Sequence, residues 1–488
     1  MESKQLVRQT IGALIVVMVL LPLLYAMREA DMRLALLLLV SLVGLLLFLY
    51  LKSTFGLEDM ARGAVYATLV TTFLNQSILS VNIGFFSLFL YRILLIAAVA
   101  TYILYTLSEK GLKADFDGIS VKGIWLFLAI WLAYGTVSML WSKSIIDNFK
   151  YMSLMWMGVL FVYLANVIFT RISRLLIFYG IWMGMTIFLL VLGLINHFLR
   201  IQLPSSSLYG ASEYRNGFPT AVFTNQNDFA TFLSITFFFY VAAAKNSSSL
   251  KVRLPALFLS ILTLYVLYLT ESRAGILAVI IGLCLYVFLL VSDKVKKLLL
   301  IGSVSVAGIA ILLLSGRILD KLQLAFTQAS YYGATETMPS NLARINLLRN
   351  TLQYILDTFG LGVGAGNIPY YLKHNPAFST GGVLQVHNWL AEIAGNFGVF
   401  ILLGYVGLIL SLFIQLYRIY RKANGRAYKM LLEASMVGLA AFMASSISPS
   451  TISNLYFHWV LMGFVISVLS VFKNRLNTVD KGIEIHER

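Results

Sequence analysis

The chain alternates between long apolar runs and short polar connections over all of its 488 residues. A run of about 20 apolar residues crosses a bilayer as an α-helix. By this criterion we predict fourteen membrane-spanning helices, at residues 10–27, 34–51, 63–80, 84–107, 123–141, 151–168, 175–199, 222–244, 254–270, 275–291, 298–314, 388–416, 430–447 and 455–472. The pattern therefore predicts an all-α polytopic membrane protein.

The distribution of positive charge predicts the orientation of these helices. Cytoplasmic connections of membrane proteins are enriched in Lys and Arg. If the N-terminus is cytoplasmic, the connections on that side hold 24 of the 37 Lys and Arg residues, and each holds at least two. We therefore expect both termini in the cytoplasm and the two long connections, 200–221 and 315–386, on the outer side.

The longer outer connection contains one helical pattern. Pro339-Ser340-Asn341 is a start signal for a helix. Apolar residues then recur at helical spacing: Leu342, Ile345, Leu348, Leu352, Ile355, Leu356 and Phe359. This pattern predicts an amphipathic helix that either lies on the outer membrane surface or packs on the helix bundle, and the pattern favours neither alternative.

Composition agrees with a membrane protein and narrows the chemistry. Hydrophobic residues make up 59% of the chain and charged residues 12%, against about 25% charged in soluble proteins. The net charge of +16 does not indicate nucleic-acid binding, because no soluble domain remains to carry it. The single Cys284 excludes an intramolecular disulfide and a thiolate metal cluster.

No metal or cofactor is predicted. Asp115-Phe116-Asp117 has the spacing of a metal-binding carboxylate pair but lies in a short cytoplasmic connection among lysines. His374, His387 and His458 are not spaced as a local set of zinc ligands.

Three outer patches contain polar residues that could carry chemistry. Arg215 precedes Asn225 and Asn227 at the entrance of the 222–244 span; amides suit hydroxyl-rich ligands, although helix capping accounts for one or two of them. Arg273 stands in a tight turn, where a guanidinium can grip a phosphate or extend to lipid headgroups. His387-Asn388 begins the 388–416 span, and an imidazole can accept a proton from a sugar hydroxyl.

Two further features bear on function. Alternating glycines at 360–366 would let backbone amides approach a ligand closely. Arg92 is predicted about eight residues inside the 84–107 span, a costly position that makes it a functional candidate.

No Asp or Glu lies in the middle of a predicted span, which argues against a proton-driven transporter.

Taken in order, these features resemble the O-antigen ligase and O-antigen polymerase superfamily. The resemblance covers about residues 215–405 and rests on Arg215, the Asn-rich entrance, Glu271-Ser272-Arg273-Ala274-Gly275, the helix containing Arg344, the glycine run and His387-Asn388. As in the ligases, nine residues separate His387-Asn388 from Gly398. Three positions after this glycine the ligases often have Gly, Thr or Tyr, whereas this chain has Ile401.

The resemblance implies transfer of a glycan from undecaprenyl pyrophosphate to an acceptor hydroxyl, without metal or cofactor, outside the cytoplasmic membrane of a bacterium. Arg215 and Arg273 would hold the pyrophosphate, and Arg344 and Arg92 are further candidates for that task. His387 would act as general base or orienting group, while Asn225, Asn227 and Asn388 would contact the substrate. On this basis the chain divides into N-terminal helices (1–199), a ligase/polymerase-like core (200–416) and C-terminal helices with a cytoplasmic tail (417–488).

Within the superfamily we predict a polymerase of lipid-linked repeat units, of the Gram-positive teichuronic-acid or capsule type. An O-antigen-type ligase and a flippase or exporter of the lipid-linked glycan are alternatives, and a purely structural membrane partner is a third. The expected partners are the lipid-linked glycan, membrane lipids and other assembly proteins such as a flippase or chain-length regulator, and nucleic acid is not among them.

Overall fold

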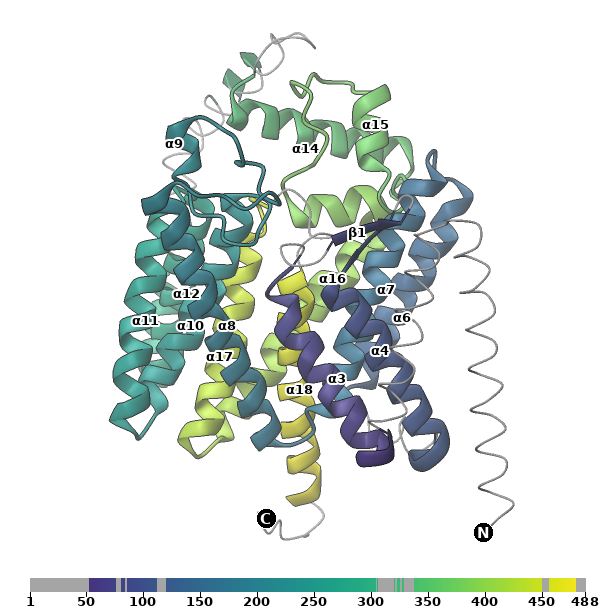
Figure 1. The fold of residues 1–488 in the computed structure, drawn as a ribbon. Helices are drawn as coiled ribbons and strands as arrows, with labels where there is room; N and C mark the ends of the chain where they lie inside the picture. Colours follow the sequence, from purple (N-terminus) through teal and green to yellow (C-terminus); the bar gives the residue numbers. More distant parts are fainter. Residues whose placement is uncertain are drawn as a thin grey trace, which may run out of the picture.

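The computed structural model describes residues 52–75, 80–83, 86–111, 120–303, 338–449 and 456–479, with a few single residues between 305 and 328. Long helices stand side by side in one bundle (Figure 1). Three short or surface helices gather at one end of it: α9 (Glu213–Asn216), α14 (Ser340–Asp357) and α15 (Ile368–His374). We call this end the outer end, after the predicted orientation, and the opposite one the inner end.

Within the described residues, ten helices are long and apolar enough to cross a membrane. They are α4 (Leu90–Tyr105) with the π-helical turn η1 (Thr106–Lys110), α6 (Lys122–Val137) with the 3-10 turn η2 (Ser138–Leu140), α7 (Ile145–Ile168), α8 (Ile172–Leu199), α10 (Gln226–Asn246), α11 (Leu250–Leu269), α12 (Arg273–Leu290), α16 (Trp389–Lys422), α17 (Arg426–Ser445) and α18 (Tyr456–Val479).

These helices confirm ten of the predicted spans, the seven from 84–107 to 275–291 and the three from 388–416 onward. The span predicted at 63–80 coincides in part with α3 (Leu57–Thr72), which has 16 residues. The spans predicted at 10–27 and 34–51 lie outside the described residues, as does most of 298–314. The polytopic helical fold is thus confirmed, and the total of fourteen stays a prediction.

The span predicted at 84–107 was wrong at its start. Residues Phe86–Phe89 form strand β2, which pairs antiparallel with β1 (Ser80–Ile83) and places Ser80 opposite Phe89. A short apolar run cannot be assigned to helix or strand from periodicity alone. Because α4 begins only at Leu90, Arg92 lies in its first turn and not eight residues inside the helix.

Helices α10, α17 and α18 form the centre of the bundle. Helix α10 packs on α11, α12 and α17, while α17 also contacts α16 and α18, and α18 packs on α7. Phe232 and Phe239 of α10 stack on the buried Trp182 of α8, with ring centroids 5.8 and 4.8 Å apart. Peripheral helices instead expose large apolar side chains, among them Phe258 and Ile280. Such a surface is suited to contact with lipid, because apolar patches of this extent are unfavourable in water.

The amphipathic helix predicted in the outer connection is confirmed as α14, but its apolar row is not its packing face. Helix α14 packs on α16, and its buried face includes Asn346 and Asn350. The Nδ2 of Asn350 donates to the carbonyl of Phe378 (2.7 Å), and its Oδ1 accepts from the Phe378 N–H (3.0 Å). Leu352 and Leu356 are exposed. The buried face therefore combines these amides with the apolar Leu347 and Tyr354, and most of the predicted apolar row points outward.

Candidate functional site at the outer end

His387 lies at the outer end, immediately before α16. Its backbone has a φ of +54°, a left-handed conformation that is strained for a residue other than glycine. Two contacts hold it there. The Trp389 N–H donates to the Ser446 carbonyl (3.0 Å), and His387 Nδ1 lies 3.2 Å from the Ser448 carbonyl. Because a carbonyl oxygen only accepts, Nδ1 carries the proton and Nε2 is left as an acceptor.

The surroundings of His387 favour the neutral imidazole. Burial is the main cause that lowers the pKa of His387 below its ordinary value, and the positive charge of Arg344 lowers it further. Hydrogen bonds to the carbonyls of Ser448 and Pro449 act in the opposite direction. Burial also lowers the pKa of Arg344 itself. The charge of Arg344 of α14 therefore acts on His387 in the same direction as burial, and the imidazole can accept a proton at neutral pH.

Gly398 explains the spacing of the motif that begins at His387. Its φ of +83° and ψ of 178° interrupt α16, so a short helical segment, 389–397, precedes the long span. A Cβ on Gly398 would lie 2.3 Å from the carbonyl oxygen of Gly360. Only glycine fits a backbone with this conformation and this contact. The interval between His387 and Gly398 therefore corresponds to the length of the short segment.

The glycine run 360–366 packs against protein. The N–H groups of Val363 and Gly364 donate to the carbonyls of Gly395 and Asn396 (2.8 and 3.0 Å), and the Gly362 N–H donates to Thr358 Oγ1 (3.0 Å). The first two amides hold the loop against the short segment of α16, and the third bonds to the residue that follows α14. The interpretation that they face a ligand is therefore wrong.

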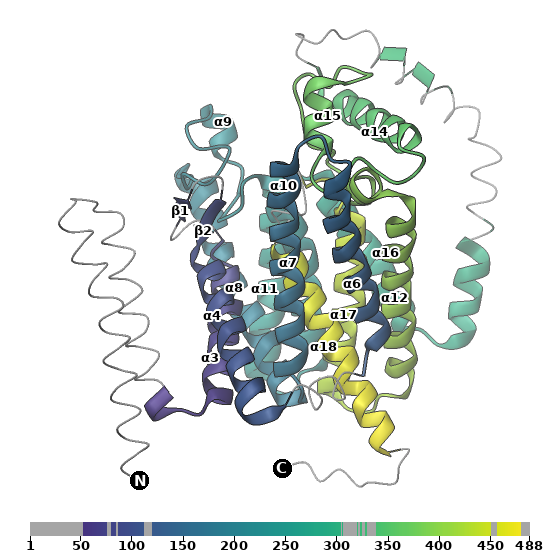
Figure 2. The ribbon, with the colours of Figure 1, turned by 90° about the vertical axis from the view of Figure 1, so that its right-hand side faces the viewer.

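Arg215 and Arg273 lie on neighbouring segments at the outer end. Arg215 is on α9, and Arg273 is the first residue of α12. The Tyr214 hydroxyl donates to Glu271 Oε1 (3.0 Å), which joins the residues next to each arginine. Both arginines are exposed. Figures 1 and 2 show α9 and α14 apart at this end, so the arginines form one group and Arg344 with His387 a second.

Helix α17 connects these two groups. It packs against α12 and α10 on one side and α16 on the other. Tyr286, near the end of α12, donates to Glu433, near the start of α17 (2.9 Å), so the two helices are antiparallel and Arg273 lies level with the end of α17. His387 contacts Ser448, just beyond that end. Arg273 and His387 thus flank the outer end of one helix, and no hydrogen bond between them is found within the described residues.

The three predicted Asn contacts differ in what already binds their side chains. Asn225 caps α10, since its Oδ1 accepts from the N–H groups of Asn227 and Asp228 (2.9 and 3.0 Å). Asn388 caps α16 by accepting from the Ala391 N–H (3.0 Å). The half-buried Asn227 makes no side-chain hydrogen bond to another described residue. Capping accounts for two of the three, and Asn227 is the better candidate for a ligand.

Arg92 is buried and has protein partners on every side. Its Nε donates to the Tyr91 hydroxyl (2.7 Å), and its other nitrogens donate to the Ser87 carbonyl and the Tyr456 hydroxyl. Its guanidinium carbon lies 4.3 Å from the centre of the Phe89 ring. These contacts fasten the start of α4 to the start of α18. Of the four arginines, Arg92 therefore has the least support as a substrate contact.

Sequence reasoning missed one buried acid near this site. Glu392 lies in the first turn of α16, is 6% exposed, and accepts a hydrogen bond from the Tyr151 hydroxyl of α7 (2.8 Å). The sequence signal that could have identified Glu392 was a single acidic residue just inside an apolar span. Among the described residues no group of three or more His, Cys, Asp or Glu side chains is arranged to hold a metal ion.

Two comparisons with known proteins indicate the family of this chain. The sequence model of the O-antigen ligase family matches residues 258–406, which include Arg273, Arg344, His387 and Gly398. The chain is also 40% identical, over 445 residues and 91% of both chains, to the teichuronic acid biosynthesis protein TuaE of Bacillus subtilis (strain 168). Similarity of this extent over nearly the whole length shows that the chain belongs to the O-antigen ligase family of membrane proteins.

Proposed function

We propose that this protein polymerises lipid-linked glycan repeat units into a surface polysaccharide of the teichuronic acid type. The transfer takes place on the outer side of the bacterial cytoplasmic membrane, and both termini are cytoplasmic. The observation that carries the proposal is His387, whose Nε2 is available as an acceptor beside the cation of Arg344. Membership of the O-antigen ligase family and the name of the Bacillus relative support it.

The proposed reaction needs a base and a stabilised leaving group. A hydroxyl of the acceptor repeat unit attacks the anomeric carbon of a glycan carried on undecaprenyl pyrophosphate, and His387 Nε2 takes the hydroxyl proton. The bond from that carbon to the pyrophosphate oxygen breaks, and the pyrophosphate leaves with the electron pair. Arg273 and Arg215 stabilise its developing charge, since fixed guanidiniums can do so without a metal. Arg344 stabilises the same charge from the side of His387.

A ligase is the second candidate, favoured by the description of the matching family. The chemistry would be the same, and only the acceptor would differ. Deleting the gene and analysing the lipid-linked sugars separates the alternatives. Single repeat units that accumulate on the outer leaflet support a polymerase. Finished but unattached chains would indicate a ligase, and repeat units retained on the inner leaflet would indicate a flippase.

The proposed base can be tested by substitution. His387→Ala is expected to abolish polymer formation, because no proton acceptor is left beside Arg344, while the protein remains inserted and abundant. Polymer length on gels and protein level in membranes are the measurements. His374→Ala is the matched control, because His374 is exposed at the same end of the molecule. Normal polymer from His387→Ala would remove this residue from the mechanism.

The leaving-group contact can be tested by two variants of Arg273. Arg273→Ala is expected to abolish polymer formation, and Arg273→Lys to impair it, because an ammonium cannot form the two parallel bonds of a guanidinium. Arg253→Ala, an exposed arginine at the inner end, serves as the control. Full activity of Arg273→Lys would mean that charge alone is needed, and full activity of Arg273→Ala would exclude the contact.

A further inference from the structure

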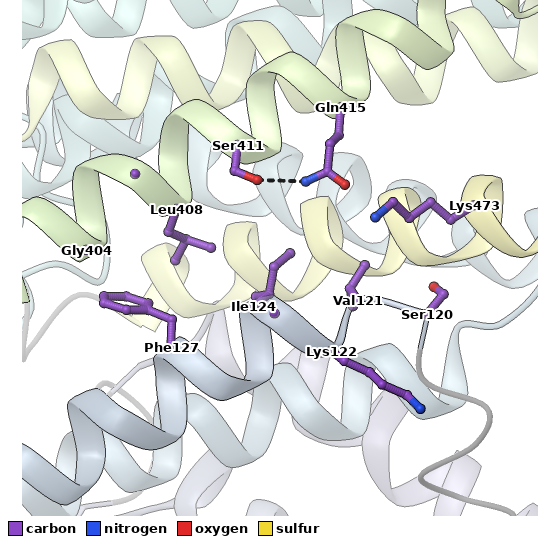
Figure 3. Close-up of a pocket in the computed structure, with 12 residues that line it drawn as sticks. Ser120, Val121, Lys122, Ile124, Phe127, Gly404, Leu408, Ser411, Gln415 and Lys473 are labelled. Carbon is purple, nitrogen blue, oxygen red and sulfur yellow. Dashed lines mark hydrogen bonds between the residues drawn. The ribbon is translucent and has the colours of Figure 1, made fainter.

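A cavity of about 350 Å³ opens between α6, α16 and α18 at the inner end, far from the outer site (Figure 3). Its polar part is formed by Ser120, Lys122, Ser411, Gln415 and Lys473, and Gln415 Nε2 donates to Ser411 Oγ (2.7 Å). The rest of its wall, farther along α6 and α16 toward the middle of the bundle, is apolar and includes Phe127 and Gly407.

The apolar part has the form of a groove along α16. Gly407 has nothing within 4 Å of the position where a Cβ would be, so the backbone of α16 is open there. At Gly404, one turn earlier, the corresponding position is filled by the Phe127 ring of α6. The exposed Leu403 and Leu410 flank this groove on the surface of α16 that faces outward from the bundle. An alkyl chain can lie in a groove of this kind without displacing protein side chains.

The polar part offers two cations. Neither Lys122 nor Lys473 forms an ion pair with another residue in the described part of the chain. Figure 3 shows the Lys473 amine directed toward Val121 and Gln415, while the Lys122 side chain starts at the same wall and points away from these residues. Ser120 lies in the same wall, but its hydroxyl is already hydrogen-bonded to Ser470 (2.9 Å). Two ammonium groups that have no carboxylate partner in the described part of the chain attract an anion.

We propose that this cavity binds an anionic phospholipid of the cytoplasmic leaflet. Lys122 and Lys473 hold the phosphate of the headgroup, and one acyl chain follows the groove along Gly407 as far as the Phe127 ring. Charge at one end and apolar groove at the other match the two parts of such a lipid. The inner end is also where basic residues of a membrane protein meet the negatively charged leaflet. This site is separate from the glycan site, and its occupation does not depend on the proposed transfer reaction.

The headgroup contact is tested by lipid binding to the purified full-length chain in detergent. Affinities for phosphatidylglycerol and phosphatidylcholine are measured by native mass spectrometry. Near an anionic surface each lysine contributes about fivefold to binding, so the pair Lys122→Gln and Lys473→Gln is expected to weaken phosphatidylglycerol binding about 25-fold. Phosphatidylcholine binding should change little. The control pair is Lys251→Gln and Lys294→Gln, exposed lysines of the inner end outside the cavity. Equal losses in the two pairs would overturn the assignment.

The acyl-chain contact has its own test. Gly407→Leu fills the groove and leaves both lysines in place, so phosphatidylglycerol binding should fall while the melting temperature is kept. Gly184→Leu is the matched control, because Gly184 of α8 is equally open. Inorganic phosphate is added as a competitor at millimolar concentration. If it displaces the lipid completely, or if Gly407→Leu binds normally, the cavity is a site for a soluble anion and the lipid proposal is wrong.

Discussion

At the scale of single residues, the charge of His387 decides whether it can act as a base. Burial and the nearby Arg344 lower its pKa, so the proton leaves the imidazole at a lower pH than usual. The neutral form is therefore fully present at neutral pH and is lost only as the pH falls through this lowered pKa. Activity that needs the neutral form should be constant above pH 7 and decline in acid.

Arg344→Gln tests this electrostatic contact. Removing the cation should raise the pKa of His387, so the acidic limb of the rate profile should move to higher pH. The polymerisation rate in isolated membranes is measured between about pH 5 and 8. The position of the limb is independent of any loss in maximal rate. Lys373→Gln, an exposed lysine of α15, is the control. A limb that stays in place in Arg344→Gln would show that the two side chains do not interact.

At the scale of elements, the break in α16 is the feature on which the site depends. The segment 389–397 is held between the loop 360–366 and the end of α17 by backbone hydrogen bonds. The N-cap of this segment adjoins His387, and its end is Gly398. A straight helix would separate the loop from α16, because the close approach of Gly398 to Gly360 would be lost.

Gly398→Ala should therefore damage both stability and activity. The strained backbone alone costs about 1–3 kcal/mol for a residue with a side chain, and the added Cβ would overlap the Gly360 carbonyl. The melting temperature of the purified protein is the measurement, with polymer formation as the second. Gly407→Ala, at an open position in the same helix, should be neutral or slightly stabilising. Equal melting temperatures for the two variants would contradict this account of the break.

At the scale of the whole molecule, one buried carboxylate joins four helices at the inner end. Glu433 of α17 has no exposed surface. It accepts hydrogen bonds from Asn246 Nδ2 (2.7 Å), the Tyr286 hydroxyl (2.9 Å) and the Tyr420 hydroxyl (3.0 Å), and it pairs with Lys245. These partners lie on α10, α12 and α16. Helix α17, which links the two halves of the outer site, is thus fixed at its other end by this cluster.

Glu433→Ala should destabilise the bundle, because the buried Asn246 amide and Tyr286 hydroxyl lose their acceptor, at about 1–3 kcal/mol for each donor left unsatisfied. Glu433→Gln retains an acceptor and should be less damaging. Thermal unfolding of the purified protein is the measurement, and Glu213→Ala, an exposed glutamate of α9, is the control. If Glu433→Ala unfolds at the temperature of the control, the cluster does not hold the bundle together.

The sequence alone was sufficient for the class of fold and most of its helices, because a spanning helix must be apolar over its whole length and that requirement is local. It also predicted the helix α14, which is confirmed, and it proposed His387, Arg344, Arg273 and Arg215 as site residues, which stay predictions. It did not predict the start of α4, where an apolar run forms strand β2, nor the packing face of α14. Both depend on which neighbours satisfy backbone and amide groups, and these neighbours are distant in the chain.

The tertiary structure alone decided how these residues relate to one another. Hydropathy locates each helix but contains no information about which helix lies beside it. Three interactions join segments that are far apart in sequence. They are the effect of the Arg344 charge on His387, the contact between Gly398 and Gly360, and the hydrogen bond from Arg92 to the Tyr456 hydroxyl. Residue type and spacing determined which groups could do chemistry. Packing around α17 determined their grouping, Arg215 with Arg273 and Arg344 with His387, because proximity between helices arises only when the bundle closes.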